Sequence, residues 1–420
     1  MPSNSRDILQ LSLQHKDGPL ALDLGASPVS GIHVSCLAGL RKHYGLEEKP
    51  VKVHEPCQML GFPEDDLLDI LGVHTCGIFS PWTKFGYENK NWKEWKTPWG
   101  QIVLVGEGFQ VDETESNIFI YPGGDRSVPP SGLMPKTGYY FDAVIRQEPI
   151  DDATLRVEDN LEEFKPITNE TLASLRQQLD AIQKTGRGTV LCVGGTGFGD
   201  IGAVPGTQLK RPKGIRDVAE WYISTVTRRE HLHAIFERQL EIALANLQRV
   251  HHVLGNAIDV IYLCGTDFGT QQSLFCSEKS FRKLWFPYYK ALNGWIHANT
   301  TWKTFKHSCG AVFQLLPALI ECGFDILNPV QCSAAGMDPK RLKEEFGGQL
   351  VFWGGGIDTQ KTLPFGTPDE VRDEVRKQID IFAPGGGFVF NTVHNIQALT
   401  PIENLAAMFE TVTGQNRHHH

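Results

Sequence analysis

The sequence lacks a hydrophobic run long enough to cross a bilayer. A stretch of roughly 18 uninterrupted apolar residues would mark a candidate membrane helix, and the chain contains none. The opening residues, MPSNSRDILQLSLQHKDGP, also lack an apolar core followed by a small-residue cleavage site, so no secretory signal is predicted. These absences predict a cytoplasmic protein that does not associate with membranes.

Clusters of basic residues and phosphate-binding loops are missing as well. The 40 Lys and Arg are scattered and are outnumbered by 49 Asp and Glu, which gives a net charge of −9. This distribution argues against nucleic acid as a partner. The glycine-rich stretch GGTGFGDIG (194–202) lacks the Gly-Lys-Ser/Thr or dinucleotide context that phosphate binding requires.

The cysteines do not form a disulfide pattern. There are nine, an odd number, and they are spread over a long chain, which favours reduced thiols in a cytoplasm. The closing residues 416–420, NRHHH, are interpreted as the remnant of a purification tag, so their histidines are excluded from any metal argument.

What the sequence does contain is a series of short apolar runs, most of which end in Gly, Asp, His or Cys. Continuous apolar runs of this kind are typical of strands that are buried on both faces of a parallel sheet. The predicted strands lie within LALDLGAS (20–27), TVLCVGG (189–195), DVIYLCGTDFG (259–269), TWKTFKHSCG (301–310), DILNPV (325–330), LVFWGGGID (350–358) and GFVFNTVHN (387–395).

Helical patterns separate these runs. Residues 228–254 carry apolar side chains at spacings of three and four. Residues 367–382 begin with Thr367 as the predicted N-cap and Pro368 in the first turn. Shorter helices are predicted over 311–322 and 339–346.

Alternation of strand and helix predicts an α/β fold, and the chain length favours a (β/α)8 TIM barrel over an open sheet. We expect residues 1–415 to form a single domain. Residues 76–165 interrupt the pattern, because they are aromatic, rich in turns and locally alternating. They are interpreted as an antiparallel insertion on the face or edge of the barrel.

One short motif points to a metal. His307 and Cys309 are separated by one residue, so in an extended chain both side chains point to the same face. Imidazole and thiolate are ligands that zinc prefers, and a catalytic zinc site keeps one position open. His394 is the predicted third ligand because it ends an apolar run in the same way. Cys332 is the competing candidate, and Asp267 is either a fourth ligand or a carboxylate that orients a ligating histidine.

The segments that carry these residues resemble the uroporphyrinogen decarboxylase superfamily. The similarity lies in IDVIYLCGTDFG, FKHSCGAVFQLLPALIECGFDILNPVQCSAAG, GGIDTQ, FNTVHNIQALTP and the opening RDILQLSLQHKDGPLALDLGAS. The resemblance implies a (β/α)8 barrel with its active site at the carboxyl ends of the strands, and a homodimer is common in the superfamily.

Two activity classes follow from this resemblance. The decarboxylases of haem synthesis carry an N-terminal Arg-Gln-Ala-Gly-Arg motif, and this chain lacks it, which argues against porphyrinogen as the substrate. The second class comprises zinc-dependent methyltransferases that use a His-x-Cys pair and a distant Cys. Here His307 and Cys309 match the pair, and His394 stands at the distant position, so the site has one thiolate in place of two.

The preferred hypothesis is therefore a zinc-dependent transfer of a methyl group between a substrate heteroatom and a corrinoid such as methylcobalamin. The signature Asp-x-His-x-x-Gly is absent from the chain, so the resemblance implies a separate corrinoid protein as partner. Asp267 and Asp358 are the predicted catalytic residues. The predicted substrate-binding residues are Asp23, Gln360 and Asn395.

Two alternatives stay open at this stage. One is a decarboxylase or lyase of the uroporphyrinogen decarboxylase type that acts without a corrinoid, either metal-assisted on a small carboxylate or on a porphyrinogen. The other is a barrel that binds a ligand and has no catalytic activity.

Overall fold

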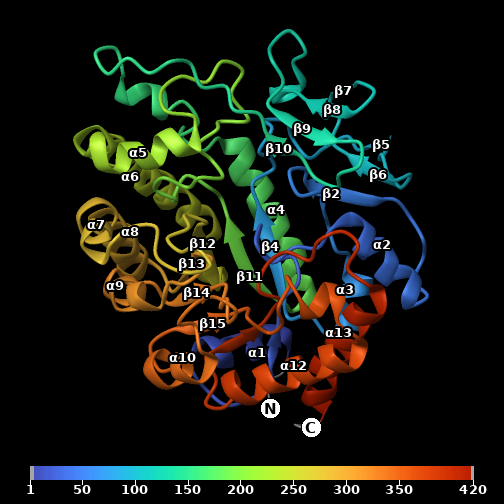
Figure 1. The fold of residues 1–420 in the computed structure, drawn as a ribbon. Helices are drawn as coiled ribbons and strands as arrows, with labels where there is room; N and C mark the ends of the chain where they lie inside the picture. The colour runs from blue at the N-terminus through green and yellow to red at the C-terminus, as the bar shows by residue number, and fades with distance from the viewer. Residues whose placement is uncertain (1–3, 418–420) are drawn as a thin grey trace.

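Eight parallel strands form the central sheet of the computed structural model, which describes residues 4–417 (Figure 1). The strands follow one another around the sheet in the order β1-β16-β15-β14-β13-β12-β11-β4. The predicted (β/α)8 fold is confirmed. The barrel strands are β1 (Ala21–Leu22), β4 (Thr75–Phe79), β11 (Gly188–Cys192), β12 (Val260–Cys264), β13 (Lys303–His307), β14 (Ile326–Asn328), β15 (Val351–Trp353) and β16 (Phe388–Phe390).

Strands β1 and β4 meet where the sheet closes on itself. The backbone N–H of His74 donates to the carbonyl of Leu22 at 2.9 Å, and the N–H of Leu22 donates to Nδ1 of His74 at 3.0 Å. The Asp23 carboxylate also accepts from the Thr75 hydroxyl at 2.7 Å. One backbone hydrogen bond and two hydrogen bonds that involve side chains therefore connect the two edges of the sheet at β1 and β4.

Successive side chains of each barrel strand point to opposite faces of the sheet, and they form two separate apolar layers. Side chains such as Val190, Val260, Phe305 and Trp353 fill the barrel interior. The residues between them face outward and pack against the helices. Because the interior is filled by side chains, the functional groups of the barrel are confined to its ends.

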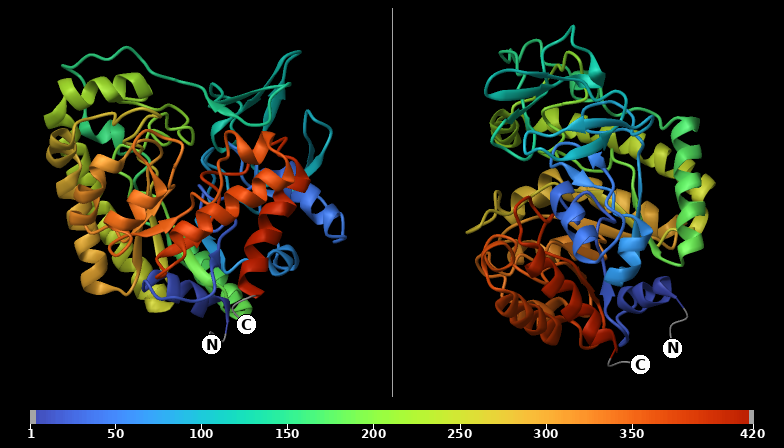
Figure 2. Two further views of the ribbon diagram at one scale, coloured as in Figure 1. Left: turned by 60° about the horizontal axis from the view of Figure 1, so that its bottom comes forward. Right: turned by 90° about the vertical axis from the view of Figure 1, so that its right-hand side faces the viewer.

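The helices surround the strands (Figure 2). Thr367 caps α12 as predicted, since its hydroxyl accepts from the N–H of Glu370 and the Glu370 carboxylate accepts from the N–H of Thr367. The α-helices are α1 (Ser5–Leu13), α2 (Val34–His43), α3 (Asp65–Leu71), α4 (Asn169–Thr185), α5 (Val218–Thr227), α6 (Arg229–Leu254), α7 (Glu278–Leu284), α8 (Phe286–Asn299), α9 (Leu316–Glu321), α10 (Pro339–Phe346), α11 (Thr362–Phe365), α12 (Pro368–Phe382) and α13 (Ile402–Arg417). Short 3-10 helices are η1 (Pro122–Gly124), η2 (Val157–Asn160), η3 (Gly255–Ala257) and η4 (Phe313–Leu315).

Two small sheets lie at the end of the molecule opposite the termini (Figures 1 and 2). One has the order β10-β9-β8-β7 and is antiparallel; the other has the order β3-β2-β6-β5 and includes one parallel pair, β2 with β6. Their strands are β2 (Val51–Glu55), β3 (Leu60–Gly61), β5 (Lys93–Lys96), β6 (Ile102–Val105), β7 (Val111–Glu113), β8 (Asn117–Ile120), β9 (Gly132–Pro135) and β10 (Asp142–Ala143).

These sheets correct the expected bounds of the insertion, 76–165. Residues 76–79 belong to barrel strand β4, whose pairing with β11 begins at Thr75. Residues 51–61, which precede the expected insertion, supply two strands of the second small sheet. The sequence of β4, TCGIF, is short and directly follows a helix and a tight turn. Its local pattern therefore resembles that of the turn-rich segment after it and predicts a place in the insertion.

Near the chain end, Asn416 belongs to the fold, because its side-chain amide accepts from the N–H of Leu20 at 2.7 Å and donates to the carbonyl of the same residue at 3.1 Å. The tag interpretation of residues 416–420 stays a prediction, and residues 418–420 lie outside the described part of the chain. Within residues 4–417, every helix is too short or too polar to cross a bilayer.

Candidate metal centre

His307 is the last residue of β13, and Cys309 follows it in the loop. Because Phe305 points into the barrel interior, His307, two residues further along the strand, points inward as well. The backbone N–H of Cys309 donates to Oδ1 of Asp267 at 2.7 Å. The loops after β12 and β13 pack so closely that a Cβ added at Gly269 would lie 2.6 Å from the carbonyl oxygen of Cys309.

The imidazole of His307 is held in one tautomer by Asn328. The two residues are partners in the register of β13 and β14, and Nδ1 of His307 lies 2.5 Å from Oδ1 of Asn328. The amide nitrogen of Asn328 donates to the carbonyl of Trp353 at 2.9 Å, which fixes Oδ1 as the atom that faces the imidazole. Nδ1 of His307 therefore carries the proton, and the lone pair of Nε2 is available to a metal.

His394 reaches the same space from the loop that follows β16. Its neighbour Asn395 anchors this loop to the loop after β1, since Oδ1 of Asn395 accepts from the N–H of Gly31 at 2.6 Å and Nδ2 donates to the carbonyl of Pro28 at 3.0 Å. Asn395 is fully buried. Tertiary contacts therefore set the position of His394.

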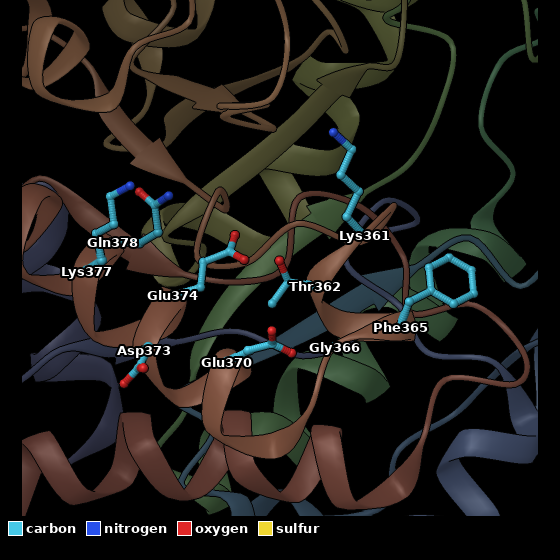
Figure 3. A pocket seen from close by; sticks show the side chains of 9 residues that line it. All are labelled: Lys361, Thr362, Phe365, Gly366, Glu370, Asp373, Glu374, Lys377 and Gln378. Carbon is cyan, nitrogen blue, oxygen red and sulfur yellow. The ribbon is translucent and has the colours of Figure 1, made fainter.

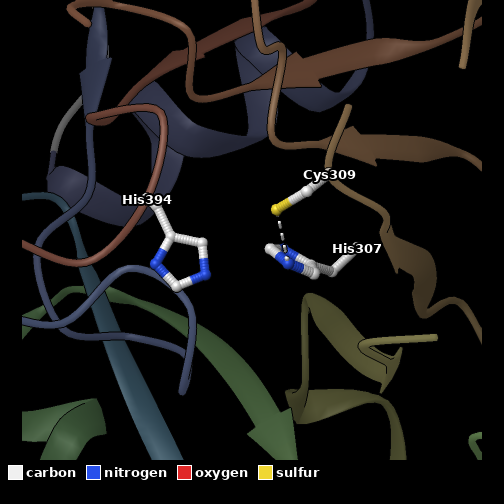
Figure 4. Close-up of side chains that lie close together, drawn as sticks. All are labelled: His307, Cys309 and His394. Atoms are coloured by element: carbon white, nitrogen blue, oxygen red, sulfur yellow. Dashed lines mark hydrogen bonds between the residues drawn. The ribbon is translucent and has the colours of Figure 1, made fainter. Parts of the chain in front are cut away.

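The three predicted ligands converge (Figure 4). One ligand atom from each of His307, Cys309 and His394 lies within 4.8 Å of the other two. Sγ of Cys309 is 3.4 Å from Nε2 of His307, and the two imidazole ring centroids are 5.4 Å apart at an angle of 71°. Two imidazole nitrogens and one sulfur at these separations can share a single divalent ion.

Burial sets the protonation of these ligands. It lowers the pKa of His307 and of His394 to about 4 in each case, so both imidazoles are neutral at neutral pH. Burial also raises the pKa of the Cys309 thiol, and the carboxylate of Asp267 raises it further. A bound cation would favour the thiolate, so metal binding at this centre would release a proton.

Asp267 lies beside the three ligands. Its Oδ1 is 3.8 Å from Nε2 of His307, and burial raises its pKa above the ordinary value. The group of three mutually close ligand atoms does not include Asp267 or Cys332. Cys332 is partly buried, and burial raises the pKa of its thiol to about 12.

The other predicted site residues occupy different surroundings. Asp23 is buried, and its carboxylate accepts from Thr75 and from Nε1 of Trp353 at 2.8 Å. Oδ1 of Asp358 accepts from the backbone N–H of exposed Gln360 at 2.6 Å. The structure thus places Asp267 with the three ligands, whereas contacts within the fold hold the carboxylates of Asp23 and Asp358. Substrate or catalytic roles for Asp23, Asp358, Gln360 and Asn395 stay predictions.

Sequence reasoning missed four residues around the centre: Asn328, Asp200, Tyr262 and Lys84. Asn328 orients His307, and Asp200 follows β11 at the end of the glycine-rich stretch. A Cβ added at Gly265 would lie 2.9 Å from the Tyr262 hydroxyl, 3.4 Å from Oδ2 of Asp200 and 3.7 Å from Cδ2 of His307. Lys84 is the fourth, since its charge lowers the pKa of His307 and of His394. The signal available for Asp200 was its place in the glycine-rich stretch (194–202) that follows a predicted strand.

A large open groove lies elsewhere, over α11 and α12 (Figure 3). Its volume is about 740 Å³, and its walls include Lys361, Phe365 and Glu374. Glu374 accepts from the N–H of Asp358 at 2.8 Å. The groove shares no lining residue with the centre formed by His307, Cys309 and His394.

Comparison with known proteins identifies the family. A family model described as Uroporphyrinogen decarboxylase (URO-D) matches residues 141–415, which is well over half of the 420 residues. The chain belongs to the uroporphyrinogen decarboxylase (URO-D) family. All three converging residues lie inside the matched range. The likeness expected for the opening residues lies outside it and stays a prediction.

Two individual proteins illustrate how far the similarity extends. A uroporphyrinogen decarboxylase from Azoarcus sp. (strain BH72) is 36% identical over 70 residues, and this match spans 17% of the URO-D chain described here and 19% of the relative. A methyltransferase from Methanosarcina mazei has a similar structure, with a TM-score of 0.53 and 13% identity, and the alignment covers 98% of each chain. At that identity the likeness shows the fold.

Proposed function

We propose that this URO-D family protein is a zinc-dependent methyltransferase that moves a methyl group between a substrate heteroatom and a corrinoid carried by a separate protein. The observation that carries the proposal is the convergence of His307, Cys309 and His394. In a tetrahedral zinc site, ordinary Zn–N and Zn–S bond lengths separate neighbouring ligand atoms by about 3.3–3.6 Å. The 3.4 Å between Sγ of Cys309 and Nε2 of His307 agrees with that geometry.

Zinc supplies Lewis acidity that lowers the pKa of a bound heteroatom. His307, Cys309 and His394 are the residues that would hold the ion, and the fourth position of the tetrahedron would be left for the substrate. Asn328 keeps Nε2 of His307 unprotonated, so that its lone pair would be available to the ion. Asp267 is placed to accept the proton that the heteroatom loses, because its buried carboxyl has a raised pKa and lies 3.8 Å from Nε2 of His307.

The structural likeness to the Methanosarcina mazei methyltransferase supports this class of reaction. The competing function is decarboxylation without a corrinoid, and the partial match to the Azoarcus decarboxylase favours it. The two differ in their need for a corrinoid: the proposed methyl transfer requires one, whereas the decarboxylation proceeds without it.

The deciding measurement is metal content together with corrinoid methylation. We expect about one zinc ion per chain in the wild type beyond any metal held by the C-terminal histidines. The variants His307→Ala, Cys309→Ala and His394→Ala should lose it, and Cys332→Ala is the matched control that should keep it. Every variant carries the same terminal histidines, so their contribution cancels.

Methylcobalamin consumption in visible absorbance provides the second readout, with candidate methyl donors and acceptors supplied in turn. Zinc that stays bound in all three ligand variants would refute the proposed centre. Loss of zinc in the first two variants but not in His394→Ala would move the third ligand to Cys332 or to Asp267.

A further inference from the structure

The backbone of Lys84 belongs to a turn that packs onto the barrel, and hydrogen bonds hold it in place. The N–H of Thr83 donates to the carbonyl of Tyr87 at 2.9 Å, and Phe85 is fully buried between them. The carbonyl of Lys84 accepts from the Thr207 hydroxyl at 2.6 Å. Thr207 belongs to the long loop after β11, so the turn and this barrel loop hold each other in place.

The side chain of Lys84 extends toward the metal centre. A Cβ added at Gly202 would lie 3.4 Å from Nζ of Lys84 and 3.2 Å from Oδ1 of Asp200. A Cβ added at Gly265 would lie 3.4 Å from Oδ2 of the same Asp200 and 3.7 Å from Cδ2 of His307. Asp200 therefore lies close both to the ammonium group of Lys84, whose side chain is exposed, and to the imidazole of His307.

Among the described residues, Nζ of Lys84 has no hydrogen-bond partner and no carboxylate oxygen within 4.0 Å. Two lysines elsewhere in the same region are paired: Lys90 with Glu88, and Lys136 with Glu113 at 3.0 Å. An ammonium group without a partner is free to bind an anionic group of a ligand.

The acids nearest to Lys84 are already engaged. The Glu55 carboxylate accepts from the backbone N–H groups of Cys57 at 3.0 Å and Gln58 at 2.8 Å. The Asp200 carboxylate accepts from backbone N–H groups at 2.9 and 3.2 Å. Both acids raise the pKa of Lys84 against the opposing effect of burial. They keep the ammonium charged without bonding to it.

We propose that Lys84 binds a carboxylate of the substrate while the reacting heteroatom faces His307, Cys309 and His394. The inference rests on the proposed metal-dependent function and names its substrate class: a small molecule with a heteroatom at one end and a carboxylate at the other. The segment that interrupts the barrel pattern would thus supply a specificity-determining residue to the centre.

Binding of two thiol probes to the cobalt(II)-loaded protein tests this assignment. The probe 3-mercaptopropionate carries a carboxylate and 2-mercaptoethanol does not, and thiolate coordination to cobalt(II) is followed by its charge-transfer absorbance. We expect the wild type to bind the carboxylate probe roughly tenfold to a hundredfold more tightly, the range expected of a hydrogen bond to a charged group. Lys84→Met should bring the two affinities close together, and Lys84→Arg should keep most of the preference.

The matched control is Lys136→Met, which removes a paired lysine of the same region and should leave the preference unchanged. Thermal unfolding identifies any variant that fails to fold, and Lys84→Gln then takes the place of Lys84→Met. If cobalt binds and Lys84→Met keeps the full preference, Lys84 has only a structural role and the inference is wrong. If the wild type takes up no cobalt, the metal-dependent function fails and the substrate assignment fails with it.

Discussion

At the scale of single residues, the orientation of the His307 imidazole depends on a neighbouring side chain, Asn328. Asn328 accepts from Nδ1 of the imidazole and donates to the carbonyl of Trp353. This chain of hydrogen bonds determines which nitrogen of His307 has a free lone pair. The orientation of the ligand is therefore decided by the strand next to it.

Replacing Asn328 tests this account. Asn328→Ala should weaken metal affinity tenfold to a hundredfold, the range for loss of a group that orients a ligating histidine. Chelator competition measures the affinity, and exposed Asn299→Ala is the control. Thermal unfolding of the metal-free protein is measured alongside, because Asn328 is fully buried. An affinity equal to that of the control would contradict the role given to Asn328.

At this scale the sequence predicted the three residues that converge, because each follows or ends an apolar run. It could not predict Asn328, which lies inside the run DILNPV (325–330). The partnership of His307 with Asn328 is a matter of strand register, and register depends on how neighbouring strands are staggered around the barrel. No local pattern along the chain predicts how the strands are staggered.

At the scale of elements, closure of the barrel depends on polar contacts between short strands. Strand β1 has only two residues, and the Asp23 that follows it bonds to Thr75 of β4 and to Trp353 of β15. All the groups that contact this carboxylate are donors, including the N–H of Ala26 at 3.2 Å. The carboxylate therefore joins three strands that are far apart in sequence.

Asp23→Asn would place an amide N–H₂ against at least one of these donors. We expect the free energy of unfolding to fall by about 1–3 kcal/mol, the cost of leaving a buried polar group without its partner. Urea denaturation measures the change, and Asp180→Asn on the surface of α4 is the control. Metal content should stay at the wild-type level. Loss of metal with unchanged stability would instead favour the predicted role at the substrate site.

At the scale of the whole molecule, several buried histidines make the fold sensitive to acid. Burial lowers the pKa of His33, His54 and His74 to about 4 in each case, from the ordinary value of 6.5. Nδ1 of His74 accepts from the N–H of Leu22, so it has to stay unprotonated. Between pH 6.5 and about 4 the unfolded chain binds more protons than the folded one, and stability therefore falls as the pH falls through that window.

His54 offers a test of this effect. It packs beside Phe62 and Phe79, and its Nε2 is buried without a hydrogen-bond partner. His54→Phe should make the metal-free protein more stable at pH 4.5 by on the order of 2 kcal/mol and change its stability little at pH 7.5. Denaturation at both pH values measures this, with exposed His252→Ala as the control. Equal loss of stability in acid for wild type and His54→Phe would show that His54 does not contribute.

The sequence by itself determined the fold class, every barrel strand except β4, and the residues that can bind a metal. It could do so because apolar runs, caps and ligand types are local properties of the chain. Only the tertiary structure decided that residues 307, 309 and 394 share one space, that Asn328 orients one of them, and that Lys84 lies near Asp200 beside them. Those facts follow from closure of the barrel and from packing of distant loops, which bring together residues that no spacing along the sequence connects.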